Sequence, residues 1–215
     1  MYLVSVAMRL AVTDHHGPLK QEEDMLVSLK DLKGFSIQAR DGEIGKVNDF
    51  YFDDQAWTVR YLVDRAGFWL FGRQVLISPA SIREINSDQM IFFVELTRDQ
   101  DGPGLKSSEN VLGYHISTNN GDLGFVDDFI VSSKTWEIRY MVIDARKGLN
   151  GKKILIAPEW IDWISWKKQR VSVSMDKEKI QGCPDFDLSI PIGREYEELL
   201  YDHYECKKYW DDNAR

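Results

Sequence analysis

The sequence of 215 residues has little cysteine and histidine. Its two cysteines, Cys183 and Cys206, stand in no CxxC spacing. An isolated pair of this kind is typical of free thiols, and it excludes a disulfide framework. The four histidines form neither an HxxxH nor an HExxH arrangement, so the ligand set of a zinc site is missing. We therefore expect no metal and no cofactor.

Basic residues are a minority, 27 against 35 acidic ones, which gives a net charge of −8. A protein that neutralises phosphates usually carries the opposite balance, so we expect no nucleic-acid partner. Long apolar runs are lacking too. Residues 1–12 are apolar, but they are shorter than the roughly 20 residues that cross a bilayer, and no positive charge precedes them as in a signal peptide. We expect a cytoplasmic protein without membrane insertion, and peripheral association with a membrane complex stays open.

What is present is an ordinary globular composition. The chain is 43% hydrophobic and 29% charged, with six prolines, which excludes general disorder. At about 150 residues per domain, the length leaves room for one large domain or two small ones.

The chain repeats itself at an offset of 79 residues, which superimposes residues 32–96 on 111–175. A repeat of this kind determines the fold, so it takes precedence over local patterns. Similar residues recur in order, as in segments 47–50 and 126–129, 57–63 and 136–142, and 72–79 and 151–158. The chain therefore contains two copies of one unit, each the size of a small domain that closes its own core.

Composition places the domain boundaries around the two copies. Residues 98–108 have the Gly, Pro and Ser content of a linker. Residues 1–24 lack apolar periodicity after their apolar start, so we expect a mobile extension. The predicted parts are an N-terminal extension at 1–24, a first domain at 25–99, a linker at 100–108, a second domain at 109–176 and a C-terminal tail at 177–215.

Each copy has the pattern of short strands. Aromatic and β-branched residues alternate with period two between turns rich in Gly and Asp. In the first copy, a two-residue turn at Asp54-Gln55 pairs Phe52 with Trp57 and Phe50 with Val59, which puts the large apolar side chains on one face. The second copy follows the same register. About six short strands per copy, without helical periodicity, predict a small closed or nearly closed β-barrel.

The tail has a different pattern. Within residues 191–205, Tyr196, Leu199, Leu200 and His203 have the i, i+3, i+4, i+7 spacing of an amphipathic helix. The fold class that the sequence predicts is therefore mainly β: two tandem small β-barrels with a C-terminal amphipathic helix.

The predicted register sends charged residues to the outer face. There Asp49 pairs with Arg60, and Asp128 pairs with Arg139 in the second copy. We interpret both as structural cross-strand ion pairs, each worth about 0.2–1 kcal/mol.

The same register also sends apolar residues outward, namely Val47, Leu62, Val126, Ile130 and Met141. Contiguous exposed apolar patches usually mark interfaces. We therefore predict that these five residues mediate contacts, either barrel against barrel or between protomers of a homo-oligomer.

Two further patterns have structural interpretations that we favour. Asp53 and Asp54 suit a hard cation such as calcium, but their spacing is not that of an EF-hand, which indicates a solvated acidic turn. Trp160, Trp163 and Trp166 have helix-like spacing close to three basic residues, Lys167, Lys168 and Arg170. Packing in a core or an interface is favoured over stacking on bases.

Several motifs resemble those of the PRC-barrel family, named for the H subunit of the photosynthetic reaction centre. In the first copy they are 41–54 (DGEIGKVNDFYFDD), 57–64 (WTVRYLVD) and 72–79 (GRQVLISP). In the second they are 121–129 (GDLGFVDDF), 136–144 (WEIRYMVID) and 151–158 (GKKILIAP). The tail segments 183–187 (CPDFD) and 194–201 (REYEELLY) resemble those of bacterial two-barrel members.

The resemblance implies an assembly role. In reaction-centre H subunits the barrel is a cytoplasmic cap on membrane partners, and in a ribosome-maturation factor a similar barrel docks onto a ribosomal protein. The family supplies no catalytic residues, and no nucleophile–base pair is visible in the sequence. We expect a non-enzymatic protein–protein interaction or assembly module, related to complexes of the H-subunit type. The alternatives are a small-ligand or metal-binding regulatory barrel and an RNA-processing or ribosome-assembly adaptor.

Overall fold

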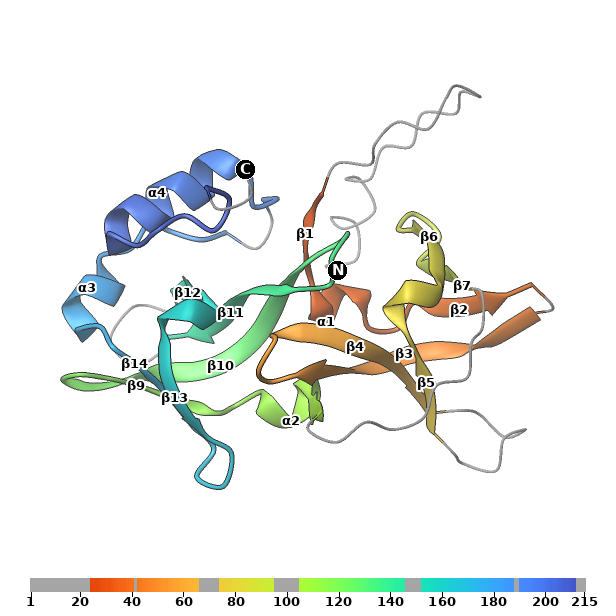
Figure 1. Ribbon diagram of the computed structural model, residues 1–215, viewed down its shortest axis with the longest axis horizontal. Coiled ribbons are helices and arrows are strands. Elements are labelled where there is room, and N and C mark those ends of the chain that lie inside the picture. Colours follow the sequence, from red (N-terminus) through yellow and green to blue (C-terminus); the bar gives the residue numbers. More distant parts are fainter. Residues whose placement is uncertain are drawn as a thin grey trace. The chain divides into compact units, whose positions relative to one another are not determined.

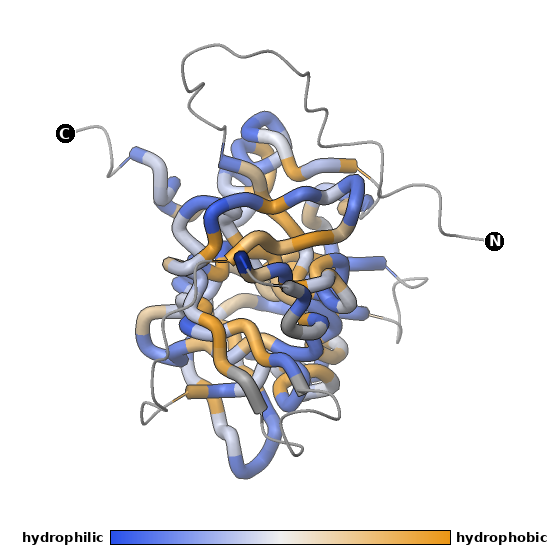
Figure 2. The backbone as a smooth tube through the Cα atoms, turned by 90° about the vertical axis from the view of Figure 1, so that its right-hand side faces the viewer, coloured by the Kyte–Doolittle hydropathy of each residue, from blue (hydrophilic) through white to orange (hydrophobic). Residues whose placement is uncertain are grey.

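A computed structural model describes residues 24–40, 42–65, 74–94, 105–145, 152–187 and 190–211. The predicted N-terminal extension, apart from Asp24, and residues 100–104 of the predicted linker lie outside these ranges. The mainly β prediction is confirmed. Hydrophobic and hydrophilic stretches alternate along the backbone (Figure 2).

The first half of the chain forms a seven-stranded sheet (Figure 1). Its path runs β5-β4-β3-β2-β7-β6, and β8 adds to β3. The elements are β1 (Leu26–Ser28), α1 (Leu29–Leu32), β2 (Ser36–Ala39), β3 (Gly42–Asp53), β4 (Thr58–Arg65), β5 (Gln74–Ile77), η2 (Pro79–Ser81), β6 (Ile82–Asn86), β7 (Ile91–Val94), β8 (Leu105–Ser107) and α2 (Ser108–Val111).

The second half repeats the same strand order, β12-β11-β10-β9-β14-β13, with β1 added to β10. Its elements are β9 (His115–Thr118), β10 (Gly121–Ser132), β11 (Ile138–Asp144), β12 (Lys153–Ile156), η3 (Pro158–Trp160), β13 (Ile161–Ser165), β14 (Arg170–Val173), α3 (Lys177–Gln181) and α4 (Arg194–Tyr204). Residues with positive φ also recur at the offset of 79: Gly34 and Gly113, Gly42 and Gly121, Trp57 and Trp136, and Met90 and Gln169.

Neither sheet closes within the described residues. No described pairing joins β5 to β6 or β12 to β13, the two ends of each path. Three-residue 3-10 turns, η2 and η3, connect these end strands instead. The described sheets are therefore open paths, and the predicted closed or nearly closed barrel stays a prediction.

Two compact units make up the chain, and they do not divide it at one point. Unit 1 extends to Asn110 and also contains Val131–Ile138, the end of the β10–β11 hairpin. Unit 2 consists of Val111–Ile130 and the residues from Arg139 onward. Inside unit 1, Thr58 and Glu137 form a β-bridge, and the ring centroid of Trp136 lies 6.4 Å from that of Phe50. The core of unit 1 thus includes a side chain from the second sequence copy, and the predicted domain boundaries stay a prediction.

Bulges give the first hairpin a register that differs from the predicted one. The β3–β4 pairing skips Asn48 on β3 and Arg60 on β4, so Phe50 lies opposite Leu62, and Phe52 lies opposite Val59. Directly opposed residues share a face, so Leu62 turns to the core side. Strict alternation cannot reveal such insertions, because one extra residue reverses every side chain that follows it.

The new register also corrects one predicted charge pair. Asp49 lies opposite Val63, and Arg60 instead contacts Asp53 at 3.4 Å on the surface. The predicted pairing of Asp49 with Arg60 is therefore wrong.

The predicted pair of Asp128 with Arg139 stays a prediction. Asp128 is buried and accepts a hydrogen bond from the Phe129 N–H at 2.7 Å. The Arg139 guanidinium lies over the ring of Tyr209, 4.3 Å from its centroid.

The hairpin loops are also longer than predicted. Four residues, not two, connect β3 to β4, and the last of them, Trp57, has φ 49°. Asp53 Oδ1 accepts hydrogen bonds from the N–H groups of Gln55 and Ala56, at 2.9 and 3.0 Å. This side-chain turn, followed by a left-handed residue, stabilises a four-residue loop.

All five predicted interface residues are buried by this chain's own atoms. None is more than 2% exposed: Val47, Leu62, Val126, Ile130 and Met141. Their predicted exposure on an outer face is therefore wrong, and no second copy is needed to cover them. The oligomeric state stays a prediction.

The C-terminal helix exists as α4, slightly shorter than predicted. Its buried residues are Glu197, Leu200, Tyr201 and Tyr204, which have i, i+3, i+4, i+7 spacing. Leu199 is 61% exposed, so the predicted stripe through Leu199 is displaced by one position.

Candidate interaction surface

Asp49 holds β8 and the start of α2 against β3 inside unit 1. Its Oδ1 accepts hydrogen bonds from the Ser108 hydroxyl at 2.8 Å and from the Glu109 N–H at 3.1 Å, and its Oδ2 accepts one from the Ser107 hydroxyl. A carboxylate at the first turn of a helix satisfies N–H groups that have no partner within the helix. Asp49 therefore has a structural role, because it attaches β8 and the start of α2 to β3.

Asp64 on β4 is a buried carboxyl with one satisfied oxygen. Its Oδ1 accepts hydrogen bonds from the Lys46 N–H and the Asn48 side chain, both at 3.3 Å. Its Oδ2 has no hydrogen-bond partner in the described structure. Burial raises the pKa of Asp64, although the hydrogen bonds from Lys46 and Asn48 lower it. In unit 2, the Asp144 carboxyl at the end of β11 is bound by the Lys153 ammonium at 2.9 Å.

We expect Asp64→Asn to change the pH dependence of stability. A carboxyl with a raised folded-state pKa stabilises the fold most at low pH, and this contribution is lost as the pH rises through that pKa. Thermal unfolding should therefore show Asp64→Asn gaining stability relative to the unmodified chain as the pH rises above the ordinary Asp pKa of about 4.

Asp53→Asn is the matched control on the same hairpin. Hydrogen bonds from the Ala56 and Gln55 N–H groups lower the pKa of Asp53, so its contribution is present above the ordinary pKa and is lost as the pH falls. As the pH rises, the stability of Asp64→Asn relative to the unmodified chain should increase, whereas that of Asp53→Asn should decrease. If the relative stability of both variants changed with pH in the same direction and by the same amount, the pKa of Asp64 would not be raised.

Glu197 is a buried acid whose two oxygens are occupied by groups of unit 2. Its Oε1 accepts hydrogen bonds from the hydroxyls of Tyr140 at 2.7 Å and Tyr209 at 3.0 Å. Its Oε2 contacts the Arg194 guanidinium at 3.0 Å. Burial raises the pKa of Tyr140 far above its ordinary value, so this hydroxyl stays protonated and donates.

Aromatic contacts complete the attachment of the tail. The Trp160 ring lies 5.0 Å from that of Tyr201 and 4.7 Å from that of Tyr204, and the Arg194 guanidinium lies 4.0 Å from the Trp210 ring centroid. Aromatic pairs and cation–π contacts at such distances are stabilising. The cluster fastens α4 to the sheet of unit 2.

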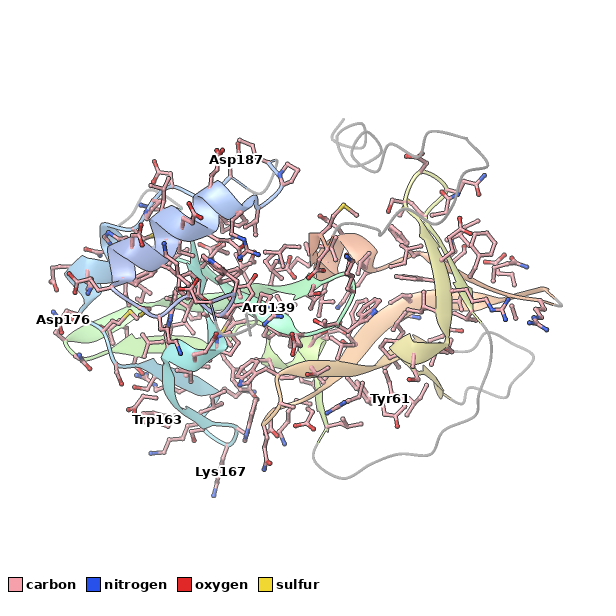
Figure 3. All side chains as sticks on the ribbon, turned by 45° about the horizontal axis from the view of Figure 1, so that its top comes forward. Tyr61, Arg139, Trp163, Lys167, Asp176 and Asp187 are labelled. Atoms are coloured by element: carbon pink, nitrogen blue, oxygen red, sulfur yellow. The ribbon has the colours of Figure 1, made fainter. Side chains whose placement is uncertain are left out.

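The β13–β14 hairpin of unit 2 carries a different kind of cluster. Trp163 on β13 is 45% exposed, and Lys167 and Lys168 in the adjoining turn are exposed. The Lys167 side chain extends from the tip of the hairpin away from the sheet (Figure 3). We call Trp163, Lys167 and Lys168 the Trp163 surface.

The residues directly across from Trp163 in the sheet are small. Trp163 lies opposite Ser172 on β14, and Ser172 lies opposite Ser117 on β9. Because opposed residues share a face, two small serines flank the indole on the outer side of the sheet.

The equivalent hairpin of unit 1 is a natural comparison. The β6–β7 pairing has the same register and the same bulge, with Glu84 at the position of Trp163. Asp88 and Gln89 stand where unit 2 has Lys167 and Lys168. The hairpin fold therefore requires neither the tryptophan nor the lysines.

Residues 25–101 match the family model of the PRC-barrel domain. This part of the chain is a PRC-barrel domain. No curated protein matches the chain. The resemblance found in the sequence is thus confirmed for the first copy. The Trp163 surface lies outside the matched PRC-barrel domain, in the unit with the same strand order.

Among the described residues, no group of three or more His, Cys, Asp or Glu side chains is arranged to hold a metal ion. None of the described helices is both long and apolar enough to cross a membrane.

Sequence patterns identified the tryptophans but not their settings. Trp160 is buried in η3, Trp163 is exposed on β13, and Trp166 is half-buried in the turn, 6.1 Å from the ring of Tyr114. Their helix-like spacing is coincidental. The self-alignment could have identified Trp163, because it places this aromatic residue where the first copy has the charged Glu84.

Proposed function

We propose that the protein is a non-enzymatic assembly module that docks onto a protein partner through the Trp163 surface. The observation that carries this proposal is the exposed indole on a hairpin that unit 1 builds with Glu84. Tryptophan at the centre of a contact is among the residues that contribute most to binding energy, whereas an exposed indole in water contributes little.

We also propose that unit 2 is a second PRC-barrel. Support comes from the identical strand order and from the positive-φ residues that recur 79 positions apart. In that case, the first copy is the domain without the docking residues, and the second copy is the same domain with the Trp163 surface added.

Site-specific photo-crosslinking tests the docking function. A benzophenone amino acid at position 163, introduced in the cells that make the protein, should capture one defined protein. The same probe at position 84 should capture much less, because Glu84 occupies the equivalent register without an aromatic contact. The captured protein is then purified and its affinity for the unmodified chain is measured.

The expected affinity loss for Trp163→Glu is at least tenfold, which corresponds to about 1.4 kcal/mol. Equal capture from positions 163 and 84, or a purified partner that binds Trp163→Glu unchanged, would reject the Trp163 surface as the docking site.

A further inference from the structure

We infer that the Trp163 surface recognises an acidic segment of the partner protein, with Trp163 as the apolar anchor and Lys167 and Lys168 pairing with carboxylates. This inference rests on the proposed docking function and specifies the chemistry of the partner. It follows from charge, from the surroundings of the two lysines and from the comparison with unit 1.

The two lysines carry uncompensated charge. In the described part of the chain, neither the Lys167 nor the Lys168 ammonium takes part in an ion pair. Other cations of unit 2 are paired, such as Arg170 with Asp122 at 2.9 Å and Lys179 with Glu205 at 3.0 Å. In a chain with 35 acidic residues, two adjacent free ammonium groups form a local positive site.

Local charge of this kind favours one type of partner. A carboxylate that approaches Lys167 and Lys168 gains attraction without breaking an existing ion pair. The net charge of −8 repels an acidic partner from the rest of the molecule. Because the partner is attracted only at the hairpin tip, the two lysines also determine its orientation. An acidic segment with an apolar residue beside its carboxylates matches both the lysines and the indole.

The form of the partner follows from the strand geometry. β13 is an end strand of its path, but its pairing with β14 skips Asp162, so a bulge interrupts its edge. Bulged edges resist the addition of another strand. Recognition therefore depends on the side chains of the Trp163 surface rather than on main-chain pairing along β13.

Unit 1 supplies the variant that tests this inference. Trp163→Glu, Lys167→Asp and Lys168→Gln together install the residues with which unit 1 builds the same register. This replacement should preserve the hairpin. The matched control, Lys134→Asp with Lys177→Gln, gives the same change in net charge as the two lysine replacements, but in the loop between β10 and β11 and at the start of α3.

The probe is a fluorescein-labelled ten-residue peptide of alternating Glu and Leu, titrated against the full chain and read by fluorescence anisotropy. We expect saturable binding that weakens as salt rises, because the ion pairs are at the surface. Lys167→Asp with Lys168→Gln, and Trp163→Glu alone, should each weaken binding at least tenfold. The Lys134/Lys177 control should bind as the unmodified chain does.

Several outcomes would overturn the inference. One is equal or tighter binding of the same peptide with Lys in place of Glu. Another is stronger binding of labelled oligouridylate or of vesicles containing phosphatidylserine, which would identify the surface as one for RNA or for anionic lipid. If crosslinking from position 163 captures a partner through a neutral or basic segment, docking stands and only its acidic chemistry fails.

Discussion

Replacing Trp136 by Ala should destabilise the protein by roughly 3–5 kcal/mol, the range for large buried aromatic side chains. The ring is buried in unit 1, 6.4 Å from Phe50 and 6.2 Å from Phe92, and these neighbours cannot fill the volume it vacates. Urea unfolding of the full chain, followed by circular dichroism, measures the loss.

Trp57→Ala is the matched control, because Trp57 has the same loop position and a positive φ but is only half-buried. Its cost should be clearly smaller. Hydrogen exchange provides a second readout: Trp136→Ala should reduce protection in β3 and β7, far away in sequence, because Phe50 and Phe92 lose their neighbour. If both substitutions cost the same and exchange changes only near position 136, then Trp136 is not part of the core of unit 1.

The sequence predicted the strands well, because their pattern is local. Alternation gave the strand at Gln74–Ile77 with its observed bounds, and the internal repeat anticipated two sheets with one strand order. It could not reveal the insertions at Asn48 and Arg60, because a bulge arises from the pairing of two strands and not from either alone. The errors at Asp49 and Leu62 in the first hairpin follow from that omission.

Long-range contacts explain the remaining differences. Asp49 is bound by Ser107 and Ser108, nearly 60 residues later, whereas the sequence suggested a cross-strand arginine. Trp136 enters unit 1 although it belongs to the second copy. Neither contact produces a periodic pattern in the sequence, so neither could be predicted from it. For the Trp163 surface the residue types were visible in the sequence, but their exposure was not, since it depends on the serines of two neighbouring strands.

A methyl group at position 124 should have a comparably large effect. A Cβ on Gly124 would lie 2.1 Å from the Asp144 carbonyl oxygen and 3.0 Å from the Ala145 Cα, which are backbone atoms of β11 and the residue after it. Backbone cannot rotate away as a side chain does, so the accommodation must separate β10 from β11. We expect Gly124→Ala to cost about 3 kcal/mol or more, at the upper end for overpacked sites. Thermal unfolding of the full chain measures this loss.

Alanine substitutions at two other glycines, Gly45 and Gly193, serve as controls for the destabilisation expected from Gly124→Ala. At Gly45 the close neighbour is the Asp64 carboxylate, a side chain that can turn, so Gly45→Ala should cost less than Gly124→Ala although its contact of 1.9 Å is shorter. At Gly193 no atom lies within 4 Å, and Gly193→Ala should cost under about 1 kcal/mol, the effect of changing a helix N-cap. The order Gly124, Gly45, Gly193 depends on which kind of atom each methyl group meets. A Gly124→Ala chain as stable as Gly193→Ala would mean that β10 and β11 lie farther apart at this point than the structure has them.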